Sequence, residues 1–380
     1  MKGFSYYNPT RIVFGRGVLN RLPKHIPLEN YQHVALISGA SAHKSGVAAK
    51  VAALPANCSV LTEPVPEEPT SDDVDRFTLH LRETNADLVI GLGGGSVMDL
   101  TKFAAYLSRN GGRCGDHDPT PHIDAPALPI ILIPTTAGTG SEVTPYAVIN
   151  HAQSGKKFTV NSPHLFPQWA VVDPDLTRTL PERYRLATGL DAWVHNLEAF
   201  LSATPHPMAD CQAKEGLALI FKHLPRAMDD PDDGTARTAL AKAALWGGLA
   251  ITHARTGLIH TLSVALAKYS NLPHGLLNAT ITPHVIAFNL AHYAKDRIEA
   301  LGELLQVPEG DREAVLVAIH RFLALLQVPY QVPLTGKADP VTDSLIARVR
   351  MDKGLPLVNP RPITDRDLAD LFGRIIRMED

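Results

Sequence analysis

The stretch DLVIGLGGGSVMDLTK, residues 87–102, decides the fold. Its first half is a short apolar run typical of a buried strand, and its second half, from about Ser96, has helical spacing. The glycines Gly93, Gly94 and Gly95 lie between the two and would let a phosphate approach the backbone, where the start of a helix offers unpaired N–H groups. The run is not the dinucleotide fingerprint GxGxxG, because Ser96 occupies the place of the third glycine. A glycine-rich turn with a purely structural role is the alternative.

The segments around this stretch alternate in the same way. Apolar runs that predict strands lie at residues 33–39, 58–64 and 128–136. Helical periodicity follows Gly46 and covers residues 71–86, where we expect Ser71 to be the N-cap. Strands and helices that alternate at this pace predict a parallel sheet covered by helices.

The second half of the chain has a different character. Strand-like runs nearly vanish after residue 180, and long helical stretches replace them. We expect these helices at residues 184–201, 207–228, 235–255, 258–269, 311–326 and 364–378. A chain of 380 residues also exceeds one ordinary core. We therefore predict an α/β domain over residues 1–180 and an all-helical domain over residues 181–380.

Metal-ligating side chains gather in the helical half. ATGLDAWVH, residues 187–195, places Asp191 and His195 four apart, so a helix would carry them on one face. His260 and His274 follow in LIHTLSVALAKYSNLPHG, residues 258–275. One carboxylate and three imidazoles suit iron(II) or zinc better than calcium or magnesium, and an open coordination position would give a Lewis acid. With 17 histidines in the chain, however, the spacing alone also allows ordinary helix-face histidines.

A second ligand-binding run, PTTAGTGSEVT, covers residues 134–144 and follows an apolar strand. Its small and hydroxyl side chains could surround a ligand, whereas a merely flexible loop is the alternative. A cofactor bound at the sheet could then meet the metal between the two domains.

Composition narrows the class of protein. Hydrophobic residues make up 45% and charged residues 20%, which fits a globular protein. The net charge of -3 gives no reason to expect nucleic acid or an anionic membrane as a partner, and no apolar run is long enough to span a bilayer. Three scattered cysteines form no CxxC pair, and the first residues lack the apolar core of a signal peptide, so we expect a cytoplasmic protein.

Taken together, GGGSVMDLTK, IPTTAGTGSEVT, ATGLDAWVH and the pair His260 and His274 resemble the iron-containing, group III alcohol dehydrogenases. The resemblance runs over essentially the whole chain. It implies a dinucleotide-binding domain, a helical metal domain and the NAD(P)-dependent interconversion of a small alcohol and an aldehyde. It also implies a homodimer or a larger homo-oligomer.

The resemblance assigns roles residue by residue. It places a divalent metal, iron(II) first and zinc as the alternative, on Asp191, His195, His260 and His274. It places the cofactor phosphates along Gly94, Gly95 and Ser96, with Asp99 nearby. It places the nicotinamide and its ribose beside Thr135, Thr136, Thr139 and Lys157.

Three departures from the family pattern are informative. Many NAD-linked relatives carry an aspartate after the first dinucleotide strand, whereas this chain has Gly39, so a 2′-phosphate would meet no carboxylate and NADPH is favoured over NADH. Ser41, His43 or Lys44 could bind that phosphate. Val264 replaces a histidine that often follows the third metal ligand by four residues, which leaves water or His253 to carry the proton. Glu68 stands where relatives often have asparagine.

The substrate is the least determined feature of the sequence. Arg255 lies five residues before His260 and could bind an anionic aldehyde that bears a phosphonate or a carboxylate. A solvated or interfacial arginine is the alternative. A glycerol-dehydrogenase-like or maleylacetate-reductase-like enzyme, a lyase of the dehydroquinate-synthase type and a non-catalytic metal-binding homologue are the rival functions.

Overall fold

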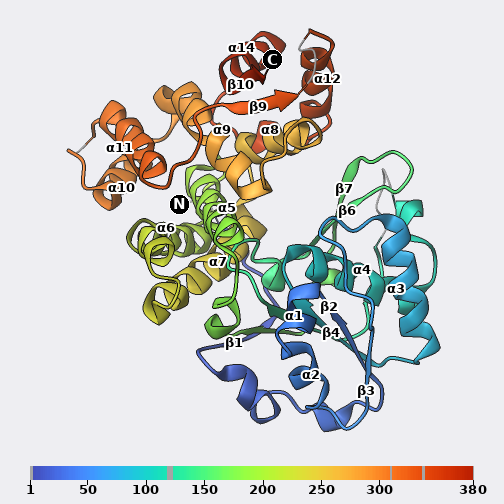
Figure 1. The fold of residues 1–380 in the computed structure, drawn as a ribbon. Coiled ribbons are helices and arrows are strands. Elements are labelled where there is room, and N and C mark those ends of the chain that lie inside the picture. Colours follow the sequence, from blue (N-terminus) through green and yellow to red (C-terminus); the bar gives the residue numbers. More distant parts are fainter. Residues whose placement is uncertain (1–2, 118–122, 309, 336–338, 380) are drawn as a thin grey trace. The chain divides into compact units, whose positions relative to one another are not determined.

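The computed structural model describes residues 3–117, 123–308, 310–335 and 339–379. The chain forms two compact units (Figure 1). One is an α/β unit, Tyr7–Leu180, and the other is a helical unit that begins at Pro181 and also takes in residues 3–6. The α/β unit is therefore bounded on both sides by chain that belongs to the helical unit.

A six-stranded parallel sheet forms the centre of the α/β unit, as the alternating pattern predicts. Its strands, in spatial order, are β1 (Arg11–Phe14), β8 (Trp169–Val172), β5 (Ile130–Pro134), β4 (Leu88–Gly93), β2 (Val34–Ser38) and β3 (Cys58–Val60). An antiparallel pair, β6 (Tyr146–Asn150) with β7 (Lys157–Asn161), stands apart from it. The first and last strands of the unit, β1 and β8, are neighbours.

Helices cover both faces of this sheet, because alternate strand residues point to opposite sides. In β2, Leu36 joins one hydrophobic core, whereas Ala35 and Ile37 join the other. The first core lies under α1 (Ala40–Lys44) and α2 (Val47–Ala52). The second lies under α3 (Ser71–Glu83) and α4 (Gly95–Asn110).

The start of α3 corrects one expectation. The N-cap is Thr70, not Ser71: the Thr70 hydroxyl accepts a hydrogen bond from the Asp73 N–H, and the Asp73 carboxylate accepts one from the Thr70 N–H. This reciprocal capping box satisfies two amides. Ser71 is the first helical residue, and its Oγ instead accepts a hydrogen bond from the Ala152 N–H at 3.1 Å.

The second unit is mostly helical, and α5 packs against α6, α7 and α9. Its longer helices are α5 (Glu182–Leu201), α6 (Pro207–Asp229), α7 (Gly234–Ala254), α8 (Leu258–Leu266), α9 (His274–Asn289), α10 (Lys295–Leu305), α11 (Arg312–Leu325), α12 (Asp339–Val349) and α14 (Asp365–Ile375). The short α13 spans Leu355–Val358. Among the described residues, no helix is both long and apolar enough to cross a membrane.

One small sheet departs from the expectation of an all-helical half. Strand β9 (Val332–Thr335) pairs in parallel with β10 (Ile376–Glu379). The helix expected over residues 364–378 therefore ends at Ile375, and the chain continues as a strand. The pairing partner lies more than forty positions earlier in the chain, so local periodicity could not reveal it.

Candidate functional site

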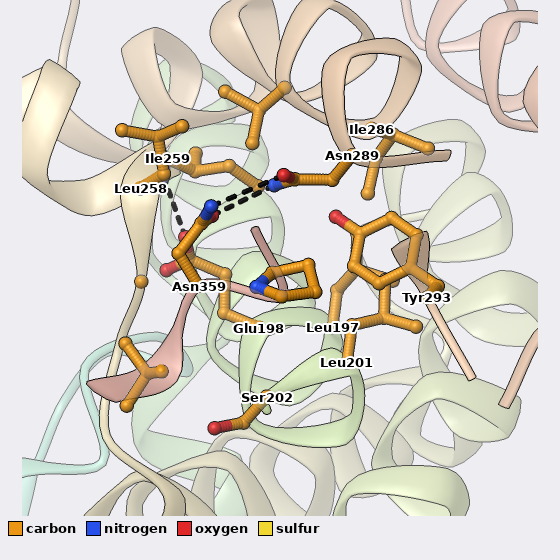
Figure 2. A pocket seen from close by; sticks show the side chains of 14 residues that line it. Leu197, Glu198, Leu201, Ser202, Leu258, Ile259, Ile286, Asn289, Tyr293 and Asn359 are labelled. Carbon is orange, nitrogen blue, oxygen red and sulfur yellow. Dashed lines mark hydrogen bonds between the residues drawn. The ribbon is translucent and has the colours of Figure 1, made fainter. Parts of the chain in front are cut away.

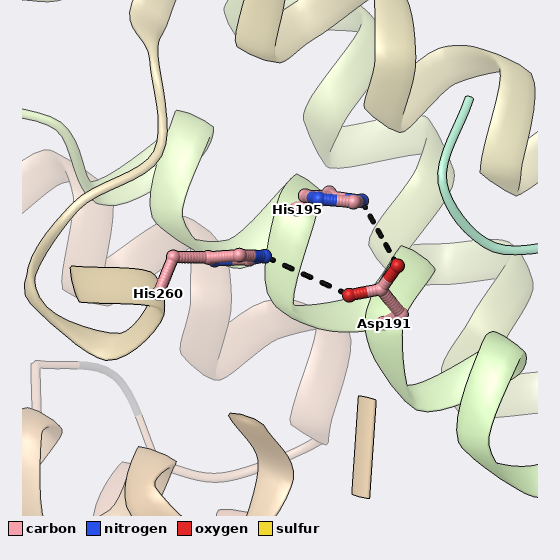
Figure 3. Close-up of side chains that lie close together, drawn as sticks. All are labelled: Asp191, His195 and His260. Atoms are coloured by element: carbon pink, nitrogen blue, oxygen red, sulfur yellow. Dashed lines mark ion pairs between the residues drawn. The ribbon is translucent and has the colours of Figure 1, made fainter. Parts of the chain in front are cut away.

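Helix α5 carries the first two candidate metal ligands. Asp191 and His195 lie one turn apart on it, and both are buried. The His195 Nδ1 lies 3.9 Å from the Asp191 Oδ2 (Figure 3). The four-residue spacing therefore places both side chains on one face of the helix.

The third candidate, His260, comes from the first turn of α8 and faces the same carboxylate. Its Nε2 lies 3.6 Å from the Asp191 Oδ1 (Figure 3). The His260 ring stacks on the His195 ring, with centroids 4.6 Å apart and an interplanar angle of 11°. One potential donor atom from each of these three residues lies within 4.8 Å of the other two.

The fourth candidate, His274, is the first residue of α9 and joins the group from its exposed side. Its Nε2 lies 3.8 Å from the Asp191 Oδ1, and its side chain is 42% exposed. The next residue is Gly275, where a Cβ would overlap the Ala187 carbonyl oxygen and come within 2.8 Å of the Asp191 Cβ. The absence of a side chain there lets α9 lie directly on α5 and bring His274 to the carboxylate.

These four side chains fit a divalent transition metal. The donor separations of 3.6 to 3.9 Å are close to those around a tetrahedral ion with bonds of about 2.1 Å. Burial alone would raise the pKa of Asp191, but His195, His260 and His274 lower it well below its usual range. At neutral pH the site thus offers an ionised carboxylate among imidazoles, which is the donor set expected for iron(II) or zinc.

Glu198 supports His260 from behind and was not identified by the sequence analysis. Its Oε2 lies 2.6 Å from the His260 Nδ1, and its Oε1 accepts a hydrogen bond from the Ile259 N–H at 2.7 Å. A carboxylate on Nδ1 fixes the ring orientation and leaves Nε2 for a metal. Burial lowers the pKa of His260, but Glu198 and Asp191 raise it to about 9. Glu198 lies seven residues after Asp191, and this two-turn spacing was the signal available in the sequence.

Replacing Glu198 with glutamine is expected to weaken zinc binding by about 10- to 100-fold above pH 9. The loss should shrink towards pH 7, because the wild-type His260, with its pKa raised to about 9, must then release a proton before a cation can bind. A chelator-buffered zinc titration at several pH values measures this. The same loss at every pH would contradict the role given to Glu198.

Glu198 also lines a small pocket (Figure 2). Its volume of about 20 Å³ is enough for about one water molecule, not for a substrate. Asn289 and Asn359 exchange amide hydrogen bonds of 2.9 and 3.2 Å at its wall (Figure 2). Burial raises the pKa of the nearby Tyr293 above its usual range. The pocket is therefore not a candidate substrate site.

The glycine turn between β4 and α4 packs closely against two threonines. A Cβ at Gly95 would come within 2.7 Å of the Thr139 Cγ2, and one at Gly94 would come within 3.3 Å of the Thr136 Cγ2. The two threonines belong to the run PTTAGTGSEVT, so the two predicted cofactor-binding runs lie side by side. Gly94 is the N-cap of α4 and provides no side-chain cap for the helix N–H groups.

A buried lysine fixes the second run to α4. Lys102 is fully buried, and its Nζ donates hydrogen bonds to the Ser141 Oγ at 2.8 Å and the Tyr146 carbonyl at 2.7 Å. Asp99, predicted to lie near the phosphates, accepts hydrogen bonds from the Ser141 hydroxyl and the Val148 N–H. Burial lowers the pKa of Lys102 to about 8, although Asp99 opposes the shift. Asp99 and Lys102 thus determine the shape of the loop.

Replacing Lys102 with methionine is expected to lower the free energy of unfolding by about 1–3 kcal/mol, because buried oxygens lose their donor. The freed loop should also weaken NAD(H) binding. Chemical denaturation and a fluorescence titration with NADH measure the two effects. Lys50→Met, at an exposed position on α2, is the control and should change neither. Unchanged affinity for NADH in the Lys102 variant would mean that the loop does not contribute to cofactor binding.

The remaining cofactor candidates have specific neighbours. The Ser96 hydroxyl donates a hydrogen bond to the Glu67 carbonyl. Lys157 forms an ion pair with Glu68, with Nζ and Oε1 3.1 Å apart. Gly39 is buried, directly follows β2 and is the N-cap of α1. The exposed residues at the start of α1 therefore lie next to the end of this strand.

The two substrate candidates, His253 and Arg255, lie at the end of α7. The His253 ring stacks on Tyr6 at 4.3 Å and on His206 at 4.8 Å. Arg255 is exposed, has a positive φ of 62° and packs over Gly354. These contacts are with Tyr6, His206 and Gly354 and not with the four candidate ligands.

Known proteins resemble this chain over nearly its whole length. Residues 9–174 match the family model "Iron-containing alcohol dehydrogenase", and residues 185–376 match "Fe-containing alcohol dehydrogenase family, C-terminal". Alcohol dehydrogenase 4 of Schizosaccharomyces pombe is 32% identical over 373 residues, which cover 97% of this chain and 88% of that protein. The NAD-dependent methanol dehydrogenase of Bacillus methanolicus is 29% identical over 378 residues, which cover 97% of this chain and 98% of that protein.

A solved structure shares the fold. The sulfoacetaldehyde reductase of Bifidobacterium kashiwanohense in complex with NAD+ superposes with a TM-score of 0.88 at 27% identity, covering 99% of each chain. The two family matches correspond to the two halves that carry the glycine turn and the four candidate ligands. The chain therefore belongs to the iron-containing alcohol dehydrogenase family, and it is an NAD-dependent alcohol or aldehyde oxidoreductase.

Proposed function

We propose that this enzyme reduces small aldehydes with NADPH at a divalent cation held by Asp191, His195, His260 and His274. The observation that carries the proposal is the approach of three imidazole side chains to one ionised, buried carboxylate. Iron(II) is the cation we favour, and the same donors would accept zinc. A cation held by these residues would supply Lewis acidity towards a substrate carbonyl.

The protein side chains have separate tasks in this proposal. Asp191 supplies the charge that retains the cation, and Glu198 holds His260 with its Nε2 available. Gly94, Gly95 and Ser96 would bind the cofactor phosphates at the start of α4. Thr135, Thr136, Thr139 and Lys157 would contact the nicotinamide and its ribose, on a loop whose shape Asp99 and Lys102 maintain.

The preference for NADPH rests on Gly39. A carboxylate at this position would accept hydrogen bonds from the ribose hydroxyls of NADH and repel a 2′-phosphate. Ser41 and Lys44, the second and the fifth residue of α1, are exposed and could bind that phosphate. His43 is held by Ser38, with Nε2 and Oγ 2.9 Å apart.

Replacing Gly39 with aspartate is expected to raise the KM for NADPH by about tenfold or more and to leave that for NADH unchanged or lower. Gly39→Ala is the matched control, because its Cβ meets Val97 at a tight 3.3 Å without adding charge. Steady-state kinetics with both cofactors measure the change. Equal effects of the two variants would mean that the charge at residue 39 plays no part.

The substrate we propose is an aldehyde that bears an anionic group, bound through Arg255. The similarity to the sulfoacetaldehyde reductase of Bifidobacterium kashiwanohense supports this class. Arg255 also has a backbone conformation, with φ 62° and ψ 171°, that is essentially restricted to glycine and costs about 1–3 kcal/mol in a residue with a side chain. Such strain tends to be retained at functional positions.

The deciding experiment is NADPH and NADH oxidation by iron- or zinc-loaded enzyme with sulfonate-, phosphonate- and carboxylate-bearing aldehydes and neutral ones. We expect turnover of the anionic aldehydes, with a KM that Arg255→Ala raises and Arg255→Lys largely preserves. Turnover of neutral aldehydes alone would remove Arg255 from the substrate site. No cofactor oxidation under any condition would favour a lyase of the dehydroquinate-synthase type, which uses NAD without net consumption.

We also propose that the enzyme works in the cytoplasm as a homodimer or a larger homo-oligomer. Cys58, Cys114 and Cys211 are all free thiols, which suits a reducing compartment. Light scattering of the purified protein at several concentrations determines the oligomeric state.

A further inference from the structure

The side-chain amide of Asn278 lies at the centre of the candidate ligand group. Asn278 is fully buried on α9, one turn after His274. Its Nδ2 donates a hydrogen bond to the Asp191 Oδ1 at 3.0 Å and lies 3.1 Å from the His260 Nε2 and 3.2 Å from the His274 Nε2. This one nitrogen is therefore within hydrogen-bond distance of a potential metal-ligating atom from three of the four candidate ligands.

These contacts use the lone pairs that a cation needs. The amide has two N–H groups; the Asp191 Oδ1 accepts a hydrogen bond from it, and the Nε2 atoms of His260 and His274 lie within hydrogen-bond distance of the same nitrogen. The same three atoms would coordinate a metal at about 2.1 Å. A cation and the N–H groups of Asn278 cannot occupy those lone pairs together, so they compete.

The other end of the amide points to the same conclusion. The Asn278 Oδ1 is buried and has no hydrogen-bond partner among the described residues. A buried carbonyl oxygen without a partner is costly, and rotation of the amide would exchange the positions of oxygen and nitrogen. With the nitrogen turned away, its N–H groups would no longer compete with the cation for the ligand atoms.

Other buried amides of the helical unit differ from Asn278 in what they bond. Asn196 donates to the carbonyl oxygens of Ala192 and Ala243, and Asn289 pairs with Asn359. Those partners are ordinary backbone and amide groups. Asn278 differs because its nitrogen is surrounded by candidate metal ligands.

We propose that Asn278 is a positioning residue that holds the ligand atoms together before the cation arrives and turns its amide as the cation binds. The inference rests on the proposed metal site. Asn278 then sets how tightly the enzyme retains its metal, because each binding event must first displace the N–H groups from Asp191 and the histidines.

Zinc affinity and thermal stability test this proposal without a measurement of activity. Asn278→Ala should raise the zinc affinity of the apoprotein by about tenfold, the worth of one or two net hydrogen bonds. It should also lower the Tm of the apoprotein more than that of the zinc-loaded protein. Asn278→Asp should increase the affinity further, because it adds a carboxylate to the donor set. Chelator-buffered titration and calorimetry of both forms give these quantities.

Asn289→Ala is the matched control, since it removes a buried amide from the same helix without touching the ligands. It should lower both Tm values alike and leave zinc affinity unchanged. Reduced zinc affinity in Asn278→Ala, or no change, would overturn the inference. A wild-type protein that binds no zinc or iron would instead overturn the proposed function.

Crystal structures of the wild-type protein with and without zinc provide a test that does not depend on a variant folding. We expect the Nδ2 to contact Asp191 in the zinc-free crystal and to have turned away in the zinc-loaded crystal. The same Nδ2 contacts in both would overturn the inference.

Discussion

Replacing Asp191 with alanine is expected to remove tight metal binding and aldehyde reduction together. Asp191 is the group to which His195, His260 and His274 are all close, at 3.9, 3.6 and 3.8 Å. Without it the three imidazoles lose their counter-charge and a cation loses its only anionic ligand among the four. We expect zinc affinity to fall by at least about 100-fold, since even an outer-shell substitution can cost that much. Metal analysis after dialysis and NADPH oxidation measure the two losses.

The control for this variant is Asp210→Asn, on a neighbouring helix of the same unit. Asp210 pairs with Arg297 at 2.6 Å and takes no part in the ligand group. It should retain metal and turnover. Asp191→Asn keeps the shape of the side chain and serves if the alanine variant does not fold. Full metal content and activity in both Asp191 variants would show that the ligand assignment is wrong.

Replacing Gly275 with alanine is expected to be the most damaging change that alters no charged or polar side chain. The added methyl group would overlap the Ala187 carbonyl oxygen of α5, and a backbone oxygen cannot move aside as a side chain can. Helix α9 must then shift away from α5 and take His274 and Asn278 with it. We expect a loss of about 3 kcal/mol in the free energy of unfolding, at the upper end for overpacking, and a large loss of metal affinity.

Gly373→Ala is the matched control, because nothing lies within 4 Å of the Cβ it adds on α14. It should be neutral or stabilise the protein by up to about 1 kcal/mol, as glycine-to-alanine changes in exposed helices do. Urea denaturation and metal analysis compare the two variants. Normal stability in Gly275→Ala would mean that α9 does not depend on this close approach.

The sequence predicted the parallel sheet well, because its signals are local. Buried strands such as β4 are continuous apolar runs, and the glycines after it mark the turn into α4. The pair of Asp191 and His195 was visible for the same reason, since four residues make one helical turn. The convergence of His260 and His274 on that pair came from the family resemblance, not from spacing.

Contacts made through space explain what the sequence did not reveal. Glu198 and Asn278 are ordinary helix residues until α8 and α9 pack against α5. Lys102 looks like a solvated lysine in the motif DLTK, yet it is fully buried because Ser141 and Tyr146 surround its ammonium group. Strand β10 follows a helix with no break in periodicity and is defined only by its distant partner β9.

The neighbouring positions of β1 and β8 have a consequence for engineering. The α/β unit starts and ends on adjacent strands, with Arg11 opposite Trp169, and chain of the helical unit precedes and follows it. It is thus an insertion within the sequence of the helical unit. Such an insertion can be exchanged for that of another family member at two junctions, because each compact unit has its own hydrophobic core. Chimeras made at residues 6 and 181 would let cofactor preference and metal preference be recombined independently.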